Sequence, residues 1–410
     1  MALMPIDEAL RRLLAQATTT GVETLRTEEA LGRVLARDVT SPTAYPFEDN
    51  SAMDGYAVLA GTGPWDVVGE SAAGAPFEGS INADQAVRIF TGGVVPKGAN
   101  TILIQENCER DGALVKTGQP PQAGRHIRRL GSDLEAGAQV MVQGSSLRGS
   151  DLSALAGLGL GQVTCHRRPR VAIFSTGDEV IPLGSKRQKG QVYDSNALFL
   201  RHAVQQSGAD IIHVDHLADD RAQVDQALRQ VIDHADLVLL SGGVSVGDHD
   251  HIGSALSALC GGLNFYKVCM KPGKPVAAAK AGGCTLLGLP GNPASTMVSF
   301  ELFARPMIKA LSGSATPHRT LRLARGLERL KAAGTRVEFL RAELCVEGVT
   351  PKARQGSGDL SSLLTVDALI YRPANAAETS AGDLQPYLAL EGPDCGTAPE
   401  AQWDHLKSQV

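Results

Sequence analysis

The sequence lacks several features that would assign it to a familiar class of protein. Its seven cysteines stand singly, with no CxxC pair and no Cys–His spacing typical of a zinc site, which argues against structural zinc and for a reducing compartment. It has no apolar segment of the signal-peptide type near the N-terminus and no uninterrupted apolar run of membrane-spanning length. We therefore expect a soluble, cytoplasmic protein that makes no contact with membranes.

Charge and catalytic motifs exclude further classes. A formal net charge of −5 and a pI near 6.1 give no overall positive field, so we expect no nucleic-acid partner. There is no Ser-His-Asp order, no nucleophile elbow and no HxxxH pair, and no glycine-rich loop ends in Gly-Lys-Ser/Thr. The 410 residues, of which 43% are hydrophobic and 20% charged, are typical of a globular chain with roughly two to four domains.

What the sequence does contain is a pattern of apolar runs that changes along the chain. An amphipathic helix is predicted near the start, over Ile6–Thr18, and residues 39–147 consist of short β-prone segments broken by glycine, proline and asparagine. Between Arg170 and Leu311 strand and helix patterns alternate, and beyond Pro317 the pattern returns to β. We therefore predict an α/β plus β fold, in which a central, doubly wound, mostly parallel sheet is flanked by β-rich domains and binds ligands at the carboxyl ends of its strands.

The most informative segment is ADLVLLSGGVSVGDHDH, residues 235–251, in which an apolar strand runs into a glycine-rich turn and then into ionisable side chains. Glycines let the backbone turn sharply and bring its N–H groups close to an anion, and carboxylates beside that anion suit Mg²⁺. The glycines and carboxylates concerned are Gly242, Gly243, Gly247, Asp248 and Asp250. The spacing alone fits equally well a tight β-to-α turn with a solvated Asp-His tail.

Two further segments place polar side chains at the same predicted edge of the sheet. STGDEV puts Asp178 or Glu179 directly after a strand, where a carboxylate either holds a cation or caps a helix. GQVYDSN puts Asp194, Ser195 and Asn196 where a helix should begin. One of these three is expected to be the N-cap of that helix, and the three together also suit a ribose or a phosphate.

Cations and a second helix start follow downstream. In KPGKP, a Pro-Gly turn holds Lys271 and Lys274 near one point, which suits a small oxyanion but also fits an exposed turn with two solvated lysines. In LPGNPAS, Ser295 lies in the first turn of a helix whose N-terminus can bind an anion. Outside the α/β segment, DNSAMDGYA, RIFTGG and RQGSGDLSS are rich in polar residues and turn formers, and each fits either a functional loop or a simple connection.

Taken together, these motifs resemble the molybdopterin molybdenumtransferase family, known as MoeA in bacteria and as the E domain of gephyrin in animals. The motifs SAMDGYA, TGG-VVPKGA, STGDEV, YDSN, SGGVSVGDHD, KPGKP and LPGNPAS occur in the family's order, and the resemblance spans about 300 residues, from Asp49 to Ser357. It implies an enzyme that takes adenylylated molybdopterin and molybdate, cleaves the phosphoanhydride with help from Mg²⁺, releases AMP and leaves molybdenum on the dithiolene.

The resemblance also implies roles for individual residues. The acidic positions around the metal and the phosphoanhydride would be Glu179, Asp219 and Asp250. Substrate contacts would come from Asp194, Ser195, Asn196, Gly242, Gly243, Ser245 and Gly247. The molybdate pocket would comprise Lys271, Lys274, Pro275, Ser295, Arg341 and Ser357. Positioning residues of the β-rich domain, directed toward the active cleft, would be Asp54, Thr91 and Asp133.

Domains and partners follow from the same resemblance. The expected domains are a small linking domain (23–41 with 146–168), a β-rich domain (42–145), the α/β molybdopterin-binding domain (1–22 with 169–317) and a C-terminal β domain (318–410). An elongated homodimer is implied, and transient contacts with other proteins of molybdenum-cofactor biosynthesis are expected.

Two other functions share parts of this pattern. A molybdopterin adenylyltransferase, which makes the adenylylated pterin from ATP, resembles only the α/β portion, whereas this chain adds β-rich segments on both sides together with the KPGKP and FLRAE elements. A gephyrin-like receptor scaffold uses this architecture with a fused second domain and linker, for which 410 residues leave no room. We therefore expect molybdenum insertion.

Overall fold

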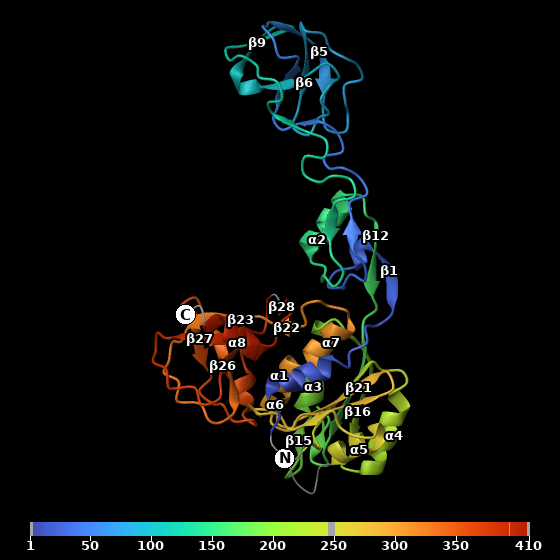
Figure 1. Cartoon of the computed structure of the whole chain (residues 1–410), viewed down its shortest axis with the longest axis vertical. Coiled ribbons are helices and arrows are strands. Elements are labelled where there is room, and N and C mark those ends of the chain that lie inside the picture. Colours follow the sequence, from blue (N-terminus) through green and yellow to red (C-terminus); the bar gives the residue numbers. More distant parts are fainter. Residues whose placement is uncertain (1–2, 245–250, 393, 408–410) are drawn as a thin grey trace. The chain divides into compact units, whose positions relative to one another are not determined.

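The computed structural model describes residues 3–244, 251–392 and 394–407, which form two compact units (Figure 1). The larger, called the α/β unit below, comprises Met1–Arg37, Gln143–Gly149 and Gln162–Val410. The smaller, called the inserted unit, comprises Asp38–Val142 and Ser150–Gly161. Among the described residues, no helix combines the length and the apolar character needed to cross a membrane, and all seven cysteines are free.

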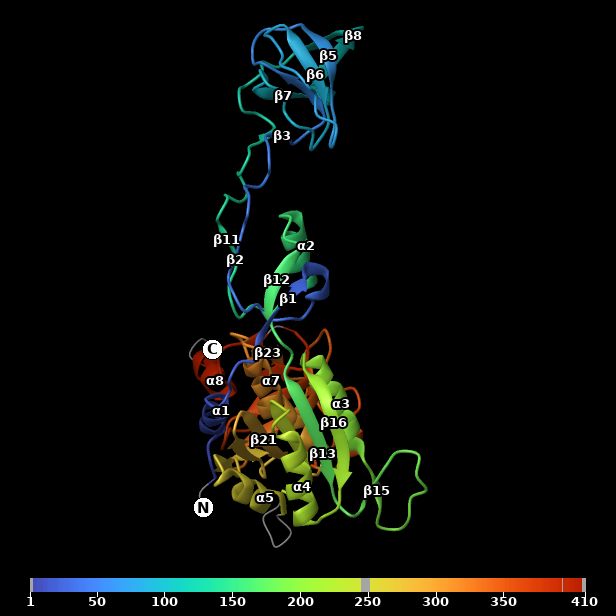
Figure 2. The same ribbon diagram turned by 90° about the vertical axis from the view of Figure 1, so that its right-hand side faces the viewer.

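A six-stranded sheet forms the centre of the α/β unit (Figure 2). Its strands lie in the order β16 (Asp210–Leu217), β13 (Arg170–Thr176), β17 (Leu237–Ser241), β21 (Cys284–Leu289), β20 (Ala277–Ala281) and β18 (Phe265–Tyr266). The first four run parallel, and β20 runs antiparallel to both of its neighbours. The mostly parallel sheet predicted from the alternating apolar runs is therefore confirmed.

Helices cover both faces of this sheet because successive side chains of each strand point to opposite sides. One face carries α1 (Ile6–Leu14), α3 (Ser195–Gln206), α6 (Pro293–Ser299) and α7 (Arg305–Leu311), with a π-helical turn at Phe300–Ala304 between the last two. The other face carries α4 (Arg221–Val231) and α5 (His251–Cys260). In β13, Val171 and Ile173 pack with the first group, whereas Ala172 and Phe174 pack with the second. The strand is thus buried on both sides, as its continuous apolar run indicates.

The order of the strands reverses between β13 and β17. The chain leaves β13 through α3 to reach β16 on one side, and then returns through α4 to β17 on the other side of β13. Because α3 and α4 cover opposite faces, the connections diverge at the carboxyl ends of β13 and β17 and leave a crevice there. This crevice is where the candidate site lies.

A second sheet follows in the C-terminal part of the α/β unit. Its strands lie in the order β19 (Met270–Lys271), β24 (Val337–Leu344), β26 (Ala368–Arg372), β27 (Leu384–Ala389) and β23 (Leu321–Arg325), and β25 (Val349–Pro351) pairs with β24. The short strands β22 (His318–Arg319) and β28 (Asp394–Cys395) pair beside it. Strand β19 belongs to the KPGKP segment, so the C-terminal sheet is joined by hydrogen bonds to the loops of the α/β sheet.

The chain does not end in β structure, as the sequence pattern predicts, but in a helix, α8 (Pro399–Lys407). This helix packs against the first one: Asp7 in α1 accepts hydrogen bonds from the backbone N–H groups of Glu400 (3.4 Å) and Ala401 (3.1 Å) and so caps α8. Burial, together with the Asp7 carboxylate beside it, raises the pKa of Glu400 to about 7.

Replacing Glu400 by glutamine should therefore stabilise the protein at alkaline pH only. The folded state holds the proton on Glu400 up to a pH near 7, whereas the unfolded chain loses it near the ordinary value of 4.5, so stability falls as the pH rises between these values. We expect the free energy of unfolding of the variant to exceed that of the wild type by on the order of 1–3 kcal/mol at pH 8 and to equal it at pH 4.5. Urea unfolding at the two pH values measures this difference, and Glu391→Gln, at an exposed position, is the control. An equal increase in the free energy of unfolding at pH 8 and at pH 4.5 would contradict the prediction.

The inserted unit is a separate β structure. Its six-stranded sheet has the order β7 (Thr101–Ile104), β4 (Gly55–Val58), β6 (Gln85–Ile89), β5 (Trp65–Ser71), β9 (Leu114–Thr117) and β8 (Cys108–Asp111). Trp65 is almost fully buried and packs with Tyr56, Val58 and Val115 in the core. Two short strand pairs also belong to the unit, β3 (Asn50–Ser51) with β10 (Ile127–Arg128) and β2 (Val39–Thr40) with β11 (Gln139–Met141). The β-rich character predicted for this region is confirmed.

The chain leaves the α/β unit and re-enters it along adjacent backbones. Strand β1 (Val22–Arg26) pairs antiparallel with β12 (Gln162–His166). Beyond them, Leu35 donates its N–H to Ser145 O (3.0 Å) and accepts the N–H of Gly144 (2.8 Å). Helix α2 (Gly149–Gly157) and short helical turns at Thr27–Glu29, Gln105–Asn107 and Leu360–Leu363 complete the elements. The division into four domains stays a prediction.

Candidate functional site

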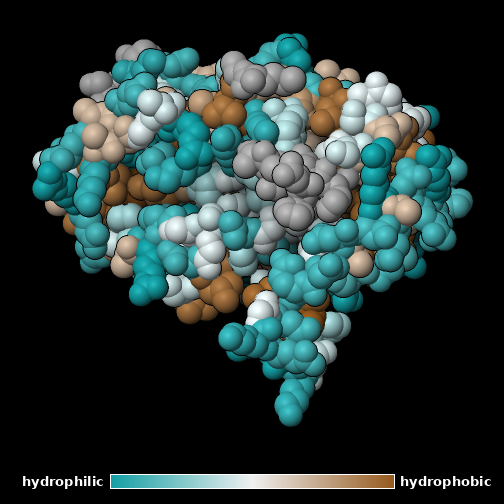
Figure 3. Space-filling view, turned by 90° about the horizontal axis from the view of Figure 1, so that it is seen from below, coloured by the Kyte–Doolittle hydropathy of each residue, from teal (hydrophilic) through white to brown (hydrophobic). Residues whose placement is uncertain are grey.

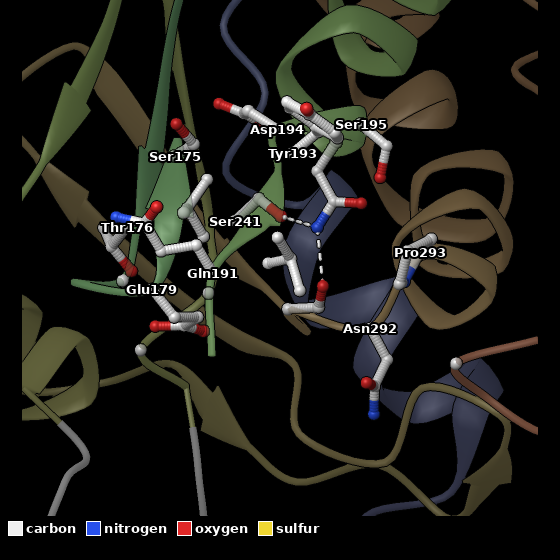
Figure 4. A pocket seen from close by; sticks show the side chains of 18 of the residues that line it. Ser175, Thr176, Glu179, Gln191, Tyr193, Asp194, Ser195, Ser241, Asn292 and Pro293 are labelled. Carbon is white, nitrogen blue, oxygen red and sulfur yellow. Dashed lines mark hydrogen bonds between the residues drawn. The ribbon is translucent and has the colours of Figure 1, made fainter. Parts of the chain in front are cut away.

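A cavity of about 800 Å³ opens at the carboxyl ends of β13, β17 and β21 (Figure 4). Each strand contributes residues at its end or just beyond it: Thr176 and Gly177 for β13, Ser241 and Gly242 for β17, and Asn292 for β21. Glu179 and Thr176 lie on one side of the opening, and Asn292 and Pro293 lie on the opposite side. The cavity thus occupies the crevice where the strand order reverses.

Close backbone approach explains the glycines of the turn after β17. Gly242 has a φ of +101°, and a Cβ atom there would lie 2.5 Å from Thr176 O, which no side chain can occupy. A Cβ atom at Gly291, after β21, would lie 3.3 Å from Gly242 Cα. Thr176 Oγ1 is buried beside this turn and has no hydrogen-bond partner among the described residues. The ends of β13, β17 and β21 are therefore packed closely together, and their backbone and hydroxyl groups lie around the same cavity.

Two carboxylates face this cavity from neighbouring loops. Glu179 follows β13, and its Oε2 lies 2.7 Å from the point where a Cβ atom at Gly177 would stand, so the carboxylate is folded back over that glycine. Asp219 follows β16, and its backbone N–H donates to Asp178 Oδ1 (3.1 Å), which ties the two loops together. Glu179 and Asp219 both line the cavity. Asp178 therefore has a structural role, whereas the carboxylate of Glu179 lies where it can bind a ligand in the cavity.

The start of α3 closes the cavity on a third side. Asp194 is the N-cap of this helix, because its Oδ1 accepts the N–H of Ala197 at 2.8 Å. Asn196 Nδ2 donates to Ser241 Oγ (2.9 Å) and to Gly291 O (2.6 Å), the two bonds drawn in Figure 4. Asn196 thereby holds the ends of β17 and β21 at a fixed separation. Of the three polar residues predicted at this helix start, Ser195 alone has neither of these roles, and all three line the cavity.

The carboxylates fit a magnesium ion bound mainly through its ligand. Within the described residues, no group of three or more His, Cys, Asp or Glu side chains is arranged to hold a metal ion. Besides Asp194, which caps α3, two carboxylates line the cavity, Glu179 and Asp219. Mg²⁺ in phosphate sites is typically held by one or two carboxylates, water and the phosphate itself, so this donor set suits it.

The KPGKP segment lies between the two sheets of the α/β unit. Lys271 forms an ion pair with Glu338 in β24, with Nζ 3.0 Å from Oε1. Gly273 has a φ of +98°, and a Cβ atom there would lie 2.6 Å from Ser299 Oγ in α6. The Lys274 side chain forms no hydrogen bond or ion pair within the described part of the chain, although its carbonyl oxygen accepts the N–H groups of Val268 (2.9 Å) and Val276 (3.1 Å). The turn is therefore packed against α6, and its two lysines differ: the first is paired and the second is available.

Arg341 in β24 is fully buried. Its Nε donates to Ser362 Oγ (3.1 Å) and its Nη2 to Gly356 O (3.0 Å), while Nη1 is buried and has no hydrogen-bond partner among the described residues. Burial lowers the pKa of this guanidinium from its ordinary value. A buried cation with an unused donor is costly unless an anion reaches it.

Ser357 brings this loop to the start of α6. Its Oγ accepts a hydrogen bond from Asn292 Nδ2 (3.1 Å), and its carbonyl oxygen accepts the N–H of Ala294 (3.1 Å), the neighbour of buried Ser295. Because Arg341 bonds to Gly356, the predicted residues Arg341, Ser357 and Ser295 converge on one loop junction.

The predicted positioning residues lie in the inserted unit. Asp54 Oδ1 accepts hydrogen bonds from the backbone N–H of Thr91 (2.7 Å) and from its hydroxyl (2.8 Å), and these bonds lower the pKa of Asp54. Asp133 is exposed in another loop, where its backbone N–H donates to Tyr45 O. The structure therefore brings Asp54 and Thr91 together and shows no contact between them and Asp133.

Seven of the residues predicted for the active site share the cavity: Glu179, Asp219, Asp194, Ser195, Asn196, Gly242 and Gly243. The predicted Ser245, Gly247 and Asp250, with the neighbouring Asp248, lie outside the described residues. Sequence reasoning missed the loop that precedes Asp194, from which Arg187, Gln191 and Tyr193 line the cavity. The run SKRQK, in which three of five residues are basic, was the signal for it.

Family models match most of the chain. Residues 4–159 match the model described as "MoeA N-terminal region (domain I and II)", residues 172–310 match "Probable molybdopterin binding domain", and residues 324–390 match "MoeA C-terminal region (domain IV)". The three matches cover in turn the inserted unit with its flanks, the central sheet with the cavity, and the second sheet.

Relatives and solved structures agree with these matches. The molybdopterin molybdenumtransferase of Haemophilus influenzae is 34% identical over 409 residues, which cover 95% of this chain and 100% of that protein. The molybdopterin molybdenumtransferase of Nostoc is 35% identical and covers 86% of this chain and 85% of its own length. A crystal structure of the molybdopterin biosynthesis moeA protein from Pyrococcus horikoshii has a TM-score of 0.83 and 26% identity, and covers 95% of this chain and 100% of that chain.

Proposed function

Because the chain belongs to the molybdopterin molybdenumtransferase family, we propose that it transfers molybdenum from molybdate to adenylylated molybdopterin, with cleavage of the phosphoanhydride and release of AMP. It is a transferase of molybdenum-cofactor biosynthesis, like the relatives it matches. The single observation that carries the finer proposal is the cavity at the strand-order reversal, where glycine turns and carboxylates face the same space.

The phosphoanhydride is assigned to the glycine turn after β17. Backbone N–H groups at a sharp glycine turn and the start of α3 offer donors to phosphate oxygens. Gly242 and Gly243 line the cavity, and Ser195 adds a hydroxyl that no other described contact uses. This arrangement binds the charge that develops when the bond to AMP breaks.

Magnesium is assigned to Glu179 and Asp219, together with Asp250 from the segment outside the described residues. When bound, Mg²⁺ would neutralise phosphate charge and polarise the bond that is cleaved. The contribution of the chain itself is to hold the carboxylates in place, through the Asp178 bond to the backbone of Asp219 (3.1 Å) and through the packing of Glu179 over Gly177.

Molybdate is assigned to the junction of the two sheets. Arg341 offers its unused Nη1, Lys274 offers an unpaired ammonium group, and Ser357 and Ser295 offer hydroxyl groups nearby. Pro275 fixes the direction of the chain after Lys274. Lys271 would join this set once an anion competes with its partner Glu338.

The inserted unit is proposed to act in positioning, through the pair Asp54 and Thr91 and through Asp133. We expect the inserted unit of one subunit to approach the cavity of the other subunit in an elongated homodimer, and this dimer is also a proposal. Transient contact with other proteins of cofactor biosynthesis is proposed on the same basis.

The deciding experiment is AMP release from adenylylated molybdopterin by the purified protein with Mg²⁺, with and without molybdate. We expect AMP release that depends on molybdate and leaves molybdenum on the pterin. If the protein releases no AMP and instead forms adenylylated pterin from ATP, the proposal is wrong and the protein is a molybdopterin adenylyltransferase.

A further inference from the structure

A basic flap projects beside the cavity. It consists of residues 182–191, between the short paired strands β14 (Val180–Ile181) and β15 (Val192–Tyr193). Figure 2 shows it standing out from the α/β unit next to the ends of β13 and β16, and it forms the hydrophilic projection at the lower edge of Figure 3. Lys186, Arg187 and Lys189 lie within it.

Hydrogen bonds give the flap a defined shape. At its base, Val192 N–H donates to Glu179 O (2.8 Å) and Asp194 N–H donates to Ile181 O (2.9 Å). The flap is thus anchored next to Glu179 and Asp194, which both line the cavity. Along its length, Gln188 N–H donates to Gln191 Oε1 (2.9 Å) and Tyr193 Oη donates to Ser185 O (3.2 Å). The flap is therefore an ordered loop with a fixed base.

The described lining of the cavity is mostly acidic and contains a single cationic side chain. Among the described residues that line it, the charged side chains are the carboxylates of Glu179, Asp194 and Asp219 and the guanidinium of Arg187. Three negative charges repel a phosphate group, and bound Mg²⁺ would offset only part of that charge. Arg187 is the only cationic side chain in this described lining, so it is the natural partner for phosphate oxygens.

Arg187 has donors to spare. Its Nη1 donates to two carbonyl oxygens of its own flap, Gln191 O (3.1 Å) and Gln188 O (3.4 Å), which hold the guanidinium against the loop. Its Nε and Nη2 form no hydrogen bond within the described structure. A guanidinium held on one side and free on the other can donate two parallel hydrogen bonds to a phosphate.

We infer that Arg187, presented by the flap, binds a phosphate group of the nucleotide part of the substrate. This deepens the proposed function, on which it rests, by naming a residue that recognises the adenylylated end of the substrate rather than its pterin end. Arg187 is a binding residue in this inference, since no bond is made or broken by it. Lys186 and Lys189, which do not line the cavity, contribute only a diffuse field.

The test uses AMP as the probe and calorimetric titration of the full chain in the presence of Mg²⁺. Arg187→Ala should weaken AMP binding about tenfold, the effect of losing charge-assisted hydrogen bonds, and Arg187→Lys should recover part of it. Lys189→Ala, a matched loss of one charge on the same flap, should change it by less than about twofold. Adenosine, which has no phosphate, should compete equally well in the wild type and in Arg187→Ala.

Three results would overturn the inference: unchanged AMP affinity in Arg187→Ala, an equal loss in Lys189→Ala, or an equal loss of adenosine binding, which would show a structural effect. Parallel assays of molybdate-dependent AMP release by the wild type separate this from the proposed function. If the wild type turns over but Arg187→Ala binds AMP normally, the inference alone is wrong. If the wild type neither binds nor releases AMP, both are wrong.

Discussion

Replacing Glu179 by glutamine is expected to lower the turnover number for AMP release by about 10²–10³-fold while the fold is retained. The side chain lines the cavity and is folded over Gly177, so the amide would fill the same volume. What is lost is a negative charge at the position assigned to Mg²⁺. The Mg²⁺ concentration for half-maximal activity should rise as well.

The measurement is initial-rate AMP release at a series of Mg²⁺ concentrations. Glu328→Gln, an exposed position on the second sheet's connecting loop, makes the same chemical change away from the cavity and should leave both values unchanged. If Glu179→Gln keeps the wild-type turnover number at every Mg²⁺ concentration, the carboxylate has no part in the reaction.

Arg341→Met is expected to raise the molybdate KM by at least about 30-fold, because truncating one side of a buried, charged contact typically costs about 2–5 kcal/mol. Arg341 is fully buried, and its Nη1 has no partner in the described structure. An oxyanion that reaches this group should also stabilise the folded state, since it binds the folded chain and not the unfolded one.

Thermal unfolding with increasing molybdate therefore gives a second readout that does not depend on turnover. The wild-type midpoint should rise with molybdate, and the Arg341→Met midpoint should not. Arg354→Met, on the exposed part of the same loop, is the matched control and should respond like the wild type. A molybdate-dependent rise in Arg341→Met equal to that of the wild type would remove Arg341 from the oxyanion site.

The sheet and its functional edge could be predicted because their signals are local. The strand 237–241 is a run of buried residues, and the glycines that follow it must lie at the carboxyl end whatever the topology. Gly242 is explained by a contact with Thr176, a residue at the end of another strand, yet its glycine identity alone pointed to close approach. At Gly242 the local sequence pattern and the tertiary contact with Thr176 therefore lead to the same conclusion.

Contacts between distant segments could not be predicted in the same way. Lys271 and Glu338 are 67 residues apart, and nothing in either motif indicates that they pair. Asn196 was predicted at a helix start, but its role in joining β17 to β21 depends on how three strand ends meet. Helix α8 was missed because its polar sequence gains stability from Asp7 and from the packing of Trp403 on Tyr371.

The point at which the inserted unit leaves the α/β unit has an evolutionary consequence. Leu35 lies just before the long segment of the inserted unit, Asp38–Val142, and Gly144 lies just after it, and these two residues are hydrogen-bonded neighbours (2.8 Å). A short turn could join them directly, because closing a loop between touching ends costs little entropy. Gain or loss of the segment between them would then leave the strand order of the central sheet and the residues that line its cavity unchanged. The chain could thus gain or lose this segment in evolution without altering the sheet.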